Sequence, residues 1–168
     1  MGASGSNPPP EKDPLSSSHS PSEGAAGRKR RDILIVEDNR ADVFLIRESI
    51  AVARIDAALH VVPDGERAIR FFEEADSDPQ APCPEVVILD INLPKRQGRE
   101  VLELLRRSSR CSQALVLVVT SSGSEQDREA MRNLGASAYF RKPSQYEDFM
   151  KLGQVLKALL DATPERSW

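Results

Sequence analysis

The sequence predicts an α/β fold in which a five-stranded parallel sheet carries helices on both faces. Short apolar runs bounded by turn residues alternate with segments whose apolar residues recur at helical spacing, the pattern of parallel strands joined by crossover helices. Five such strand–helix units fit into about 130 residues. This length favours one doubly wound sheet over two separate domains.

Local signals place the predicted elements in order. Asn39 is a suitable N-cap for the first helix, and Pro63–Gly65 forms a turn after the second strand. Ser124 followed by Asp127 has the spacing of a capping box at the start of the fourth helix. The expected strands are 32–37, 57–62, 85–90, 114–120 and 137–141, and the expected helices begin at 39 and otherwise cover 65–76, 98–108, 124–134 and 144–161.

The domain predicted at 32–161 lies between two tails, 1–31 and 162–168. The first tail is rich in Gly, Ser and Pro and cannot bury enough apolar surface to offset its ordering entropy, so we expect it to be disordered. It ends in the basic run Arg28–Arg31, most simply a solvated edge. Residues 1–31 balance at +2 and the remaining 137 at −5, and this acidic body argues against direct nucleic-acid binding.

The cysteines and the hydropathy pattern bear on the cellular compartment. Cys83 and Cys111 fall in turn-like segments and lack the spacing of metal ligands. Two cysteines in 168 residues do not make a disulfide framework, so a reducing cytoplasm is the default. The first 31 residues lack the apolar region of a signal peptide, and no apolar run reaches the length of a membrane span. We therefore expect a cytoplasmic protein without a membrane anchor.

Polar side chains end four of the predicted strands. Glu37 and Asp38 end the first strand, Asp90 the third, Thr120 the fourth and Lys142 the fifth. Ligands of open α/β sheets bind at the carboxyl ends of the strands, so these side chains are expected to meet. Carboxylates within about 4–6 Å oppose each other's ionisation, which makes such a cluster costly unless a cation or a reaction uses it.

Each of these groups fits one part of a metal-assisted phosphoryl transfer. Mg²⁺ prefers oxygen ligands, so Asp38 and Asp90 can bind it directly and Glu37 can hold a metal-bound water. The backbone carbonyl of Asn92 lies just past Asp90. The carboxylate of Asp90 can act as the nucleophile, while Lys142 offsets charge on the transferring group.

The fourth strand ends in Thr120, and several of the strand-end residues also have a purely structural explanation. The Thr120 hydroxyl can hydrogen-bond a phosphoryl oxygen and so pull on one loop. Taken singly, Asp38 could be only a helix cap, Thr120 a turn residue and Lys142 a solvated lysine at the edge of the sheet. All of these residues together at the ends of four strands favour the site.

Four segments carry a resemblance to a known family: Ile33–Asn39, Val87–Pro94, Val118–Ser121 and Tyr139–Pro143. In order and spacing they resemble the receiver domain of two-component response regulators, which has the CheY-like, flavodoxin-like fold. The resemblance covers about three quarters of the chain, from Asp32 to Asp161.

The resemblance assigns a role to each residue. Asp90 would be the phosphoacceptor, Glu37 and Asp38 the acidic pair for Mg²⁺, and Lys142 the lysine that contacts the phosphoryl group. Thr120 would be the switch hydroxyl. Tyr139 would be the aromatic switch that turns inward on activation, with a half-buried sheet residue as the alternative. The resemblance further implies a cis peptide at Lys142–Pro143. Glu37 stands where many members have Asp, which puts only its role as a direct ligand in question.

The resemblance also implies partners. The segment 90–102 is closest to the small regulators of bacterial phytochrome-type kinases, so a sensor histidine kinase is the expected phosphodonor. The chain ends soon after the fifth helix, so we expect a single-domain regulator that acts on a downstream protein or phosphotransfer partner without a fused output domain. A homodimer through the fourth helix, fifth strand and fifth helix is the expected assembly.

Three other functions compete with this interpretation. A haloacid-dehalogenase-like phosphohydrolase also uses a strand-end Asp with Mg²⁺, but the position of its usual acid/base carries Asn92. A flavodoxin-like mononucleotide binder needs a cradle of backbone N–H groups after the first strand, where this chain has two carboxylates. A pseudo-receiver that only binds partners would have lost acceptor-site residues, and here all of them are present.

Overall fold

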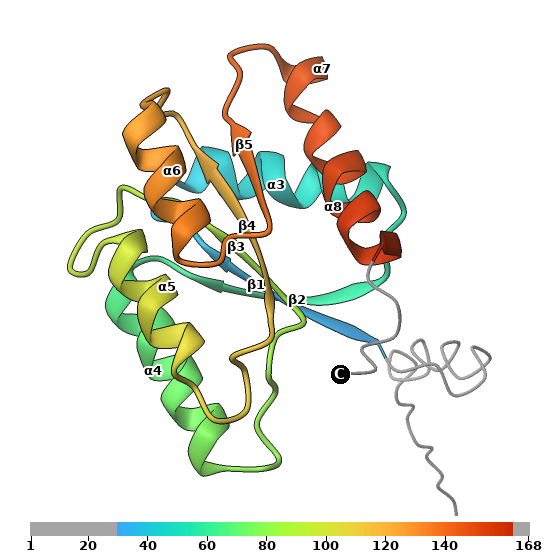
Figure 1. Cartoon of the computed structure of the whole chain (residues 1–168). Helices are drawn as coiled ribbons and strands as arrows, with labels where there is room; N and C mark the ends of the chain where they lie inside the picture. Colours follow the sequence, from blue (N-terminus) through green and yellow to red (C-terminus); the bar gives the residue numbers. More distant parts are fainter. Residues whose placement is uncertain (1–29, 163–168) are drawn as a thin grey trace, which may run out of the picture. The chain divides into compact units, whose positions relative to one another are not determined.

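Five parallel strands form the sheet, in the spatial order β2-β1-β3-β4-β5 (Figure 1). The strands are β1 (Arg31–Val36), β2 (Ala57–Val62), β3 (Val86–Leu89), β4 (Leu115–Thr120) and β5 (Ala138–Arg141). The order reverses between β1 and β3, where Ile33 lies opposite Val86 and Val36 opposite Leu89. The computed structural model describes residues 30–162, and most of the two predicted tails lies outside these residues. The first strand nevertheless takes in Arg31, one residue before the expected boundary.

Six helices follow the strands within residues 30–162: α3 (Arg40–Val52), α4 (Gly65–Ser77), α5 (Gly98–Arg106), α6 (Glu125–Asn133), α7 (Tyr146–Phe149) and α8 (Lys151–Ala162). Asn39 caps α3, since its Oδ1 accepts the backbone N–H groups of Ala41 and Asp42. Ser124 caps α6 by accepting the N–H of Asp127. Both predicted caps are confirmed. None of these helices is long and apolar enough to cross a membrane.

Helices cover both faces of the sheet, as predicted. Alternate strand residues such as Leu34 and Val87 face α4, α5 and α6, and their neighbours Ile33 and Ile88 face α3, α7 and α8 (Figure 1). All four residues of β3 are buried. Burial on two sides explains why the strands read as continuous apolar runs instead of alternating patterns.

The predicted fifth helix is wrong in one respect, because it consists of two helices that meet at Met150. The first turn of α8 packs closely on α3. A Cβ on Gly153 would stand 2.1 Å from the carbonyl oxygen of Ser49, so glycine allows the two backbones to approach. α8 ends at Ala162, one residue beyond the expected domain boundary.

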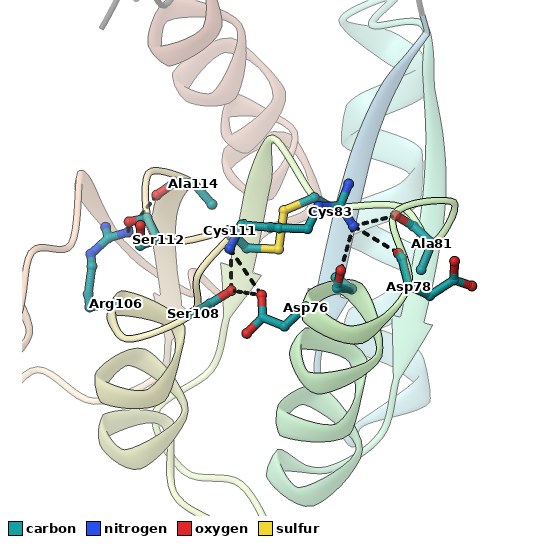
Figure 2. The surroundings of a disulfide bond; sticks show 11 residues. Asp76, Asp78, Ala81, Cys83, Arg106, Ser108, Cys111, Ser112 and Ala114 are labelled. Carbon is teal, nitrogen blue, oxygen red and sulfur yellow. Dashed lines mark hydrogen bonds between the residues drawn. A yellow bond between two sulfur atoms is a disulfide. The ribbon is translucent and has the colours of Figure 1, made fainter.

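Sequence reasoning expected no disulfide framework from the two cysteines, whereas Cys83 and Cys111 are bonded to each other in the structure (Figure 2). They are 28 residues apart in sequence, but Cys83 precedes β3 and Cys111 precedes the adjacent strand β4. Parallel pairing brings the loops that enter these strands together, with 5.6 Å between the two Cα atoms. Spacing along the chain cannot reveal this proximity.

The expected cis peptide at Lys142–Pro143 is not found, since residues 30–162 contain no cis peptide bond. A trans bond is the ordinary form even before proline, by about 0.5–1 kcal/mol. With this bond in trans, the backbone N–H of Lys142 donates to the carbonyl of Thr120, and the lysine side chain still reaches the carboxylates described below.

Candidate functional site

Three carboxylates gather at the carboxyl ends of β1 and β3, the point where the strand order reverses. Glu37 and Asp90 are buried and Asp38 is exposed, and each offers an oxygen within 4.8 Å of the others. The backbone holds the two strand ends side by side, because the N–H of Asp90 donates to the carbonyl of Val36. The predicted acidic cluster is therefore present at the predicted edge of the sheet.

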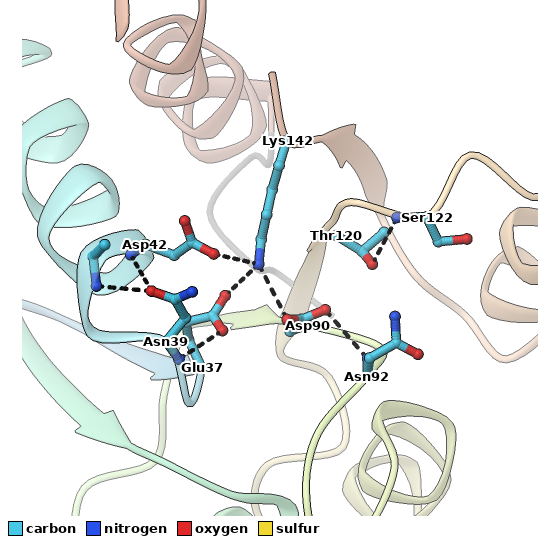
Figure 3. A network of polar contacts seen from close by, with 9 residues as sticks. Glu37, Asn39, Asp42, Asp90, Asn92, Thr120, Ser122 and Lys142 are labelled. Carbon is cyan, nitrogen blue, oxygen red and sulfur yellow. Dashed lines mark hydrogen bonds and ion pairs between the residues drawn. The ribbon is translucent and has the colours of Figure 1, made fainter. Parts of the chain in front are cut away.

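Lys142 enters this cluster from the end of β5 (Figure 3). Its Nζ donates to Glu37 Oε2 at 2.6 Å, to Asp42 Oδ2 at 2.8 Å and to Asp90 Oδ2 at 3.1 Å. An ammonium group has three N–H donors, so each has a carboxylate partner. The lysine side chain is 11% exposed, which places these contacts largely out of water. The sequence predicted that Lys142 would meet Asp90, but it did not reveal Asp42 as a partner.

Burial and mutual repulsion change the protonation of these groups. Burial raises the pKa of Glu37 to about 7, the hydrogen bond from Lys142 opposes this rise, and the charge of Asp90 adds to it. Burial alone would lower the pKa of Lys142. Its hydrogen bonds to Asp42 and Glu37, with the charge of Asp90, outweigh that effect and raise it. The carboxylates of the site thus outnumber its one ammonium group. The remaining negative charge favours the binding of a further cation or a proton.

The loop between β3 and α5 is fixed directly beside Asp90. Asp90 Oδ1 accepts the backbone N–H of Asn92 at 3.2 Å, and the N–H of Gly98 donates to the carbonyl of Ile91 at 2.9 Å. A Cβ on Gly98 would stand 2.5 Å from the carbonyl oxygen of Asp90. Glycine therefore lets the start of α5 pack under the loop that carries Asp90 and Asn92.

Thr120 and Tyr139 are linked through one residue of the next loop. Thr120 is fully buried, and its Oγ1 accepts the N–H of Ser122 at 3.2 Å. The half-buried Tyr139 donates its hydroxyl to the carbonyl of the same Ser122, also at 3.2 Å. Its ring lies 5.2 Å from the guanidinium carbon of Arg128, and burial is the main cause that raises its pKa. Sequence reasoning named Thr120 and Tyr139 but missed Ser122, which connects them.

The donor set suits a hard divalent cation. Such ions bind carboxylate and carbonyl oxygens, and the side chains of Glu37, Asp38 and Asp90 supply the carboxylates. Asn92 lies beside Asp90, at the position where sequence reasoning expected a carbonyl ligand (Figure 3). The unmet negative charge of the cluster gives an independent reason for a cation to bind there.

Comparisons with known proteins agree with this geometry. Residues 33–153 match the response regulator receiver domain family. The chain belongs to this family. Receiver domains are signalling modules that accept a phosphoryl group, and they bind a divalent metal at an acidic pocket. Membership also implies a histidine kinase partner.

Phytochrome response regulators are among the relatives. The chain is 33% identical over 126 residues to response regulator Rcp1 of Synechocystis sp., covering 75% of this chain and 86% of the relative. The crystal structure of the Mn²⁺-bound form of Rcp1 has a TM-score of 0.70, with 32% identity, and the match covers 79% of this chain and 96% of that one. The phosphorylated cyanobacterial phytochrome response regulator RcpA gives a TM-score of 0.72 at 27% identity, with coverages of 80% and 96%.

These findings confirm the predicted family and the flavodoxin-like fold. The family is one of signalling proteins rather than of conventional enzymes. The receiver domain of this chain is similar to response regulator Rcp1 over most of the length of that protein.

Proposed function

We propose that Asp90 of this receiver accepts the phosphoryl group from a sensor histidine kinase, with Mg²⁺ as the cation. The observation that carries the proposal is the convergence on Asp90 of the Lys142 ammonium and of the carboxylates of Glu37 and Asp38. This arrangement supplies a nucleophile, a cation site and a fixed positive charge at one point, the set that phosphoryl transfer needs.

In the proposed step, a carboxylate oxygen of Asp90 forms a bond to phosphorus. The bond between phosphorus and the ring nitrogen of the kinase histidine breaks, and that nitrogen keeps the electron pair and takes up a proton. The Lys142 ammonium, 3.1 Å from the Asp90 carboxylate, offsets charge on the transferring group. The contact between Asp90 Oδ1 and the N–H of Asn92 orients the nucleophile.

Glu37, Asp38, Asp90 and the backbone carbonyl of Asn92 are the proposed holders of Mg²⁺. A bound divalent cation supplies positive charge that neutralises the phosphoryl oxygens. Glu37 is longer than the Asp of many family members, and it already accepts hydrogen bonds from Lys142 and from the N–H of Asn39. We assign it to a metal-bound water and assign direct coordination to Asp38 and Asp90.

Thr120 and Tyr139 are the proposed switch. The Thr120 hydroxyl oxygen accepts the N–H of Ser122, so its own proton is available for a phosphoryl oxygen on Asp90, and a shift of the side chain toward that oxygen pulls on the Ser122 loop. The carbonyl of Ser122 is the acceptor of the Tyr139 hydroxyl, so movement of this loop releases or redirects the tyrosine. Phosphorylation of Asp90 thereby changes the surface formed by α6 and β5.

The proposed kinase is of the phytochrome type. Its support is the similarity to RcpA, a cyanobacterial phytochrome response regulator, and to a bacteriophytochrome response regulator at 30% identity and a TM-score of 0.64. Such a phosphodonor agrees with the expected place in the cytoplasm, and the output goes to a downstream protein or phosphotransfer partner.

A homodimer through α6, β5 and the two helices α7 and α8 belongs to the same proposal. That face carries Tyr139 beside Arg128 and Arg132, around a cavity of about 150 Å³. Sedimentation with and without beryllofluoride tests it, and a monomer under both conditions contradicts it.

The decisive experiment is intact-mass analysis after incubation with acetyl phosphate, with and without Mg²⁺. Wild type is expected to gain one phosphoryl group only with Mg²⁺, and Asp90→Asn none. Equal labelling of this variant overturns the site assignment. An absent adduct in wild type shifts the interpretation to a pseudo-receiver, and steady release of phosphate without an adduct revives the hydrolase.

A further inference from the structure

Asp42 is the third partner of the Lys142 ammonium, and the proposed chemistry does not yet use it. Its Oδ2 lies 2.8 Å from Lys142 Nζ, and its side chain is 21% exposed, against 2% for Glu37 and 9% for Asp90. It stands in the first turn of α3, where its backbone N–H donates to the Asn39 cap. The N–H of Asn39 in turn donates to Glu37 Oε1, so one cap fixes both acids against Lys142 (Figure 3).

The three carboxylate partners of Lys142 differ in whether they also belong to the possible cation site. Glu37 and Asp90 belong to the group of carboxylates that could hold a cation, and Asp42 does not. A cation that Asp90 binds directly and that Glu37 holds through a water therefore competes with Lys142 for these two carboxylates. Of the three partners, only Asp42 contacts the ammonium without also belonging to the possible cation site.

We propose that Asp42 is a positioning residue for Lys142. It holds the ammonium at the site while Asp90 turns to the divalent cation and the transferring group and Glu37 turns to a metal-bound water. The inference rests on the proposed function, because it assigns Lys142 to the phosphoryl group on Asp90. It adds a residue that places the lysine and that neither binds the cation nor touches the phosphoryl group.

A simpler role for Asp42 makes a different prediction. An acid in the first turn stabilises a helix through its dipole, whatever happens at Lys142. A dipole effect changes the stability of the fold but is independent of the lysine. The experiment must therefore show whether the effect of Asp42 disappears when the ammonium is absent.

The first test observes the lysine directly. The ¹H–¹⁵N signal of the Lys142 ammonium, identified by its loss in Lys142→Met, is expected to persist in wild type with Mg²⁺ alone. In Asp42→Asn with Mg²⁺ we expect it to vanish, because an ammonium without a carboxylate partner exchanges its protons quickly with water. A signal that persists in Asp42→Asn overturns the inference. This measurement needs no phosphorylation, so it decides the inference even if Asp90 accepts no phosphoryl group.

The second test is a double-mutant cycle on the labelling rate with acetyl phosphate at saturating Mg²⁺. Asp42→Asn is expected to slow labelling about tenfold, the size of one charged hydrogen bond. Asp42→Glu, which keeps the charge, should restore part of the rate. Asp161→Asn, the same change of charge at an exposed position on α8, should leave the rate unchanged.

In the Lys142→Met background, Asp42→Asn should have no further effect on labelling. An equal slowing in both backgrounds shows that Asp42 acts independently of the lysine and overturns the inference, as does an unchanged rate in Asp42→Asn alone. Wild type without any adduct contradicts the proposed function instead, and the ammonium signal then decides the role of Asp42.

Discussion

At the carboxyl end of the sheet, one ammonium group holds three carboxylates, whereas at the amino end arginines and a disulfide hold the connecting loops. The first group, Glu37, Asp42, Asp90 and Lys142, is here called the charged cluster. The second, Asp76, Arg106, Arg110 and the disulfide Cys83–Cys111, is called the loop clamp (Figure 2). Both lie at ends of the same strands, so the sheet alone does not explain the difference.

The loop clamp binds mostly to backbone carbonyls. Arg106 donates to the carbonyls of Ser112, Ala114 and Gly135. Arg110 donates to those of Ala75, Asp78 and Ala81. These bonds give loop carbonyls the partners that secondary structure does not provide.

In the charged cluster, by contrast, the negative and positive groups are not equal in number. Its ammonium has a partner for every N–H, but the carboxylates outnumber it, and burial raises the pKa of Glu37 to about 7. Unbalanced buried charge costs stability and provides a place for a cation and a phosphoryl group. Changes in the charged cluster should therefore alter chemistry first, and changes in the loop clamp should alter stability first.

Lys142→Met is expected to have the largest effect. It removes the only positive side chain that contacts Asp90 among the described residues, so labelling with acetyl phosphate should slow by about a hundredfold or more. Quench-flow or timed intact-mass measurements give the rate. Lys151→Met, which removes an exposed lysine paired with Asp148, is the control and should label at the wild-type rate. A comparable loss in the control would mean that the effect is not local.

Reduction of the disulfide should come next and should affect stability alone. The bond closes a loop with a sequence separation of 28, so its loss is expected to lower the unfolding free energy by about 3 kcal/mol. Urea unfolding with and without a phosphine reductant measures this change. A Cys83→Ser, Cys111→Ser double variant should not respond to the reductant. If reduction changes the labelling rate at equal folded fraction, the two ends of the sheet are coupled and the comparison fails.

Glu37 should make the stability depend on pH. Its pKa in the folded chain is raised to about 7 from an ordinary value of 4.5, so the folded state holds the proton more tightly. The tighter proton binding adds to the unfolding free energy. This stabilisation is complete below pH 4.5, decreases as the unfolded chain ionises, and is lost above about pH 7, where the unfolding free energy is lower by ~3 kcal/mol.

Metal-free urea unfolding of wild type and Glu37→Gln between pH 4 and 8 tests this dependence. The difference in unfolding free energy between the two proteins isolates the contribution of this one carboxyl group. As the pH rises, Glu37→Gln should become more stable relative to wild type. Parallel curves would show that Glu37 ionises in the folded chain as it does in the unfolded one.

Sequence patterns predicted what depends on local order along the chain. The apolar runs that end at Glu37 and Asp90 identified two neighbouring strands, and parallel pairing then brought their carboxylates together. The caps at Asn39 and Ser124 were likewise local and were correct.

What the sequence did not reveal depends on contacts between distant segments. Asp42 reads as an ordinary acid in the first turn of a helix, and its partner Lys142 lies 100 residues further on. Cys83 and Cys111 are joined only because β3 and β4 are adjacent. The break at Met150 interrupts a stretch whose apolar spacing continues through it, so no local signal marked it.

Arg110→Met should have the smallest effect and gives the sharpest test of the loop clamp. The substitution keeps much of the apolar stem but removes the donor shared by the carbonyls of Ala75, Asp78 and Ala81. Because these groups lie partly in water, which replaces some of the lost bonds, the expected cost is about 1–2 kcal/mol of unfolding free energy.

Arg107→Met, on the exposed residue that follows α5, provides a control of equal charge. It should leave the unfolding free energy unchanged, and both variants should label on Asp90 at the wild-type rate. An equal loss of stability in the two variants would assign the effect to net charge instead of to the carbonyl bonds. A change in labelling would show that the amino end of the sheet also sets the geometry at Asp90, since β3 joins the disulfide directly to the strand end that carries it.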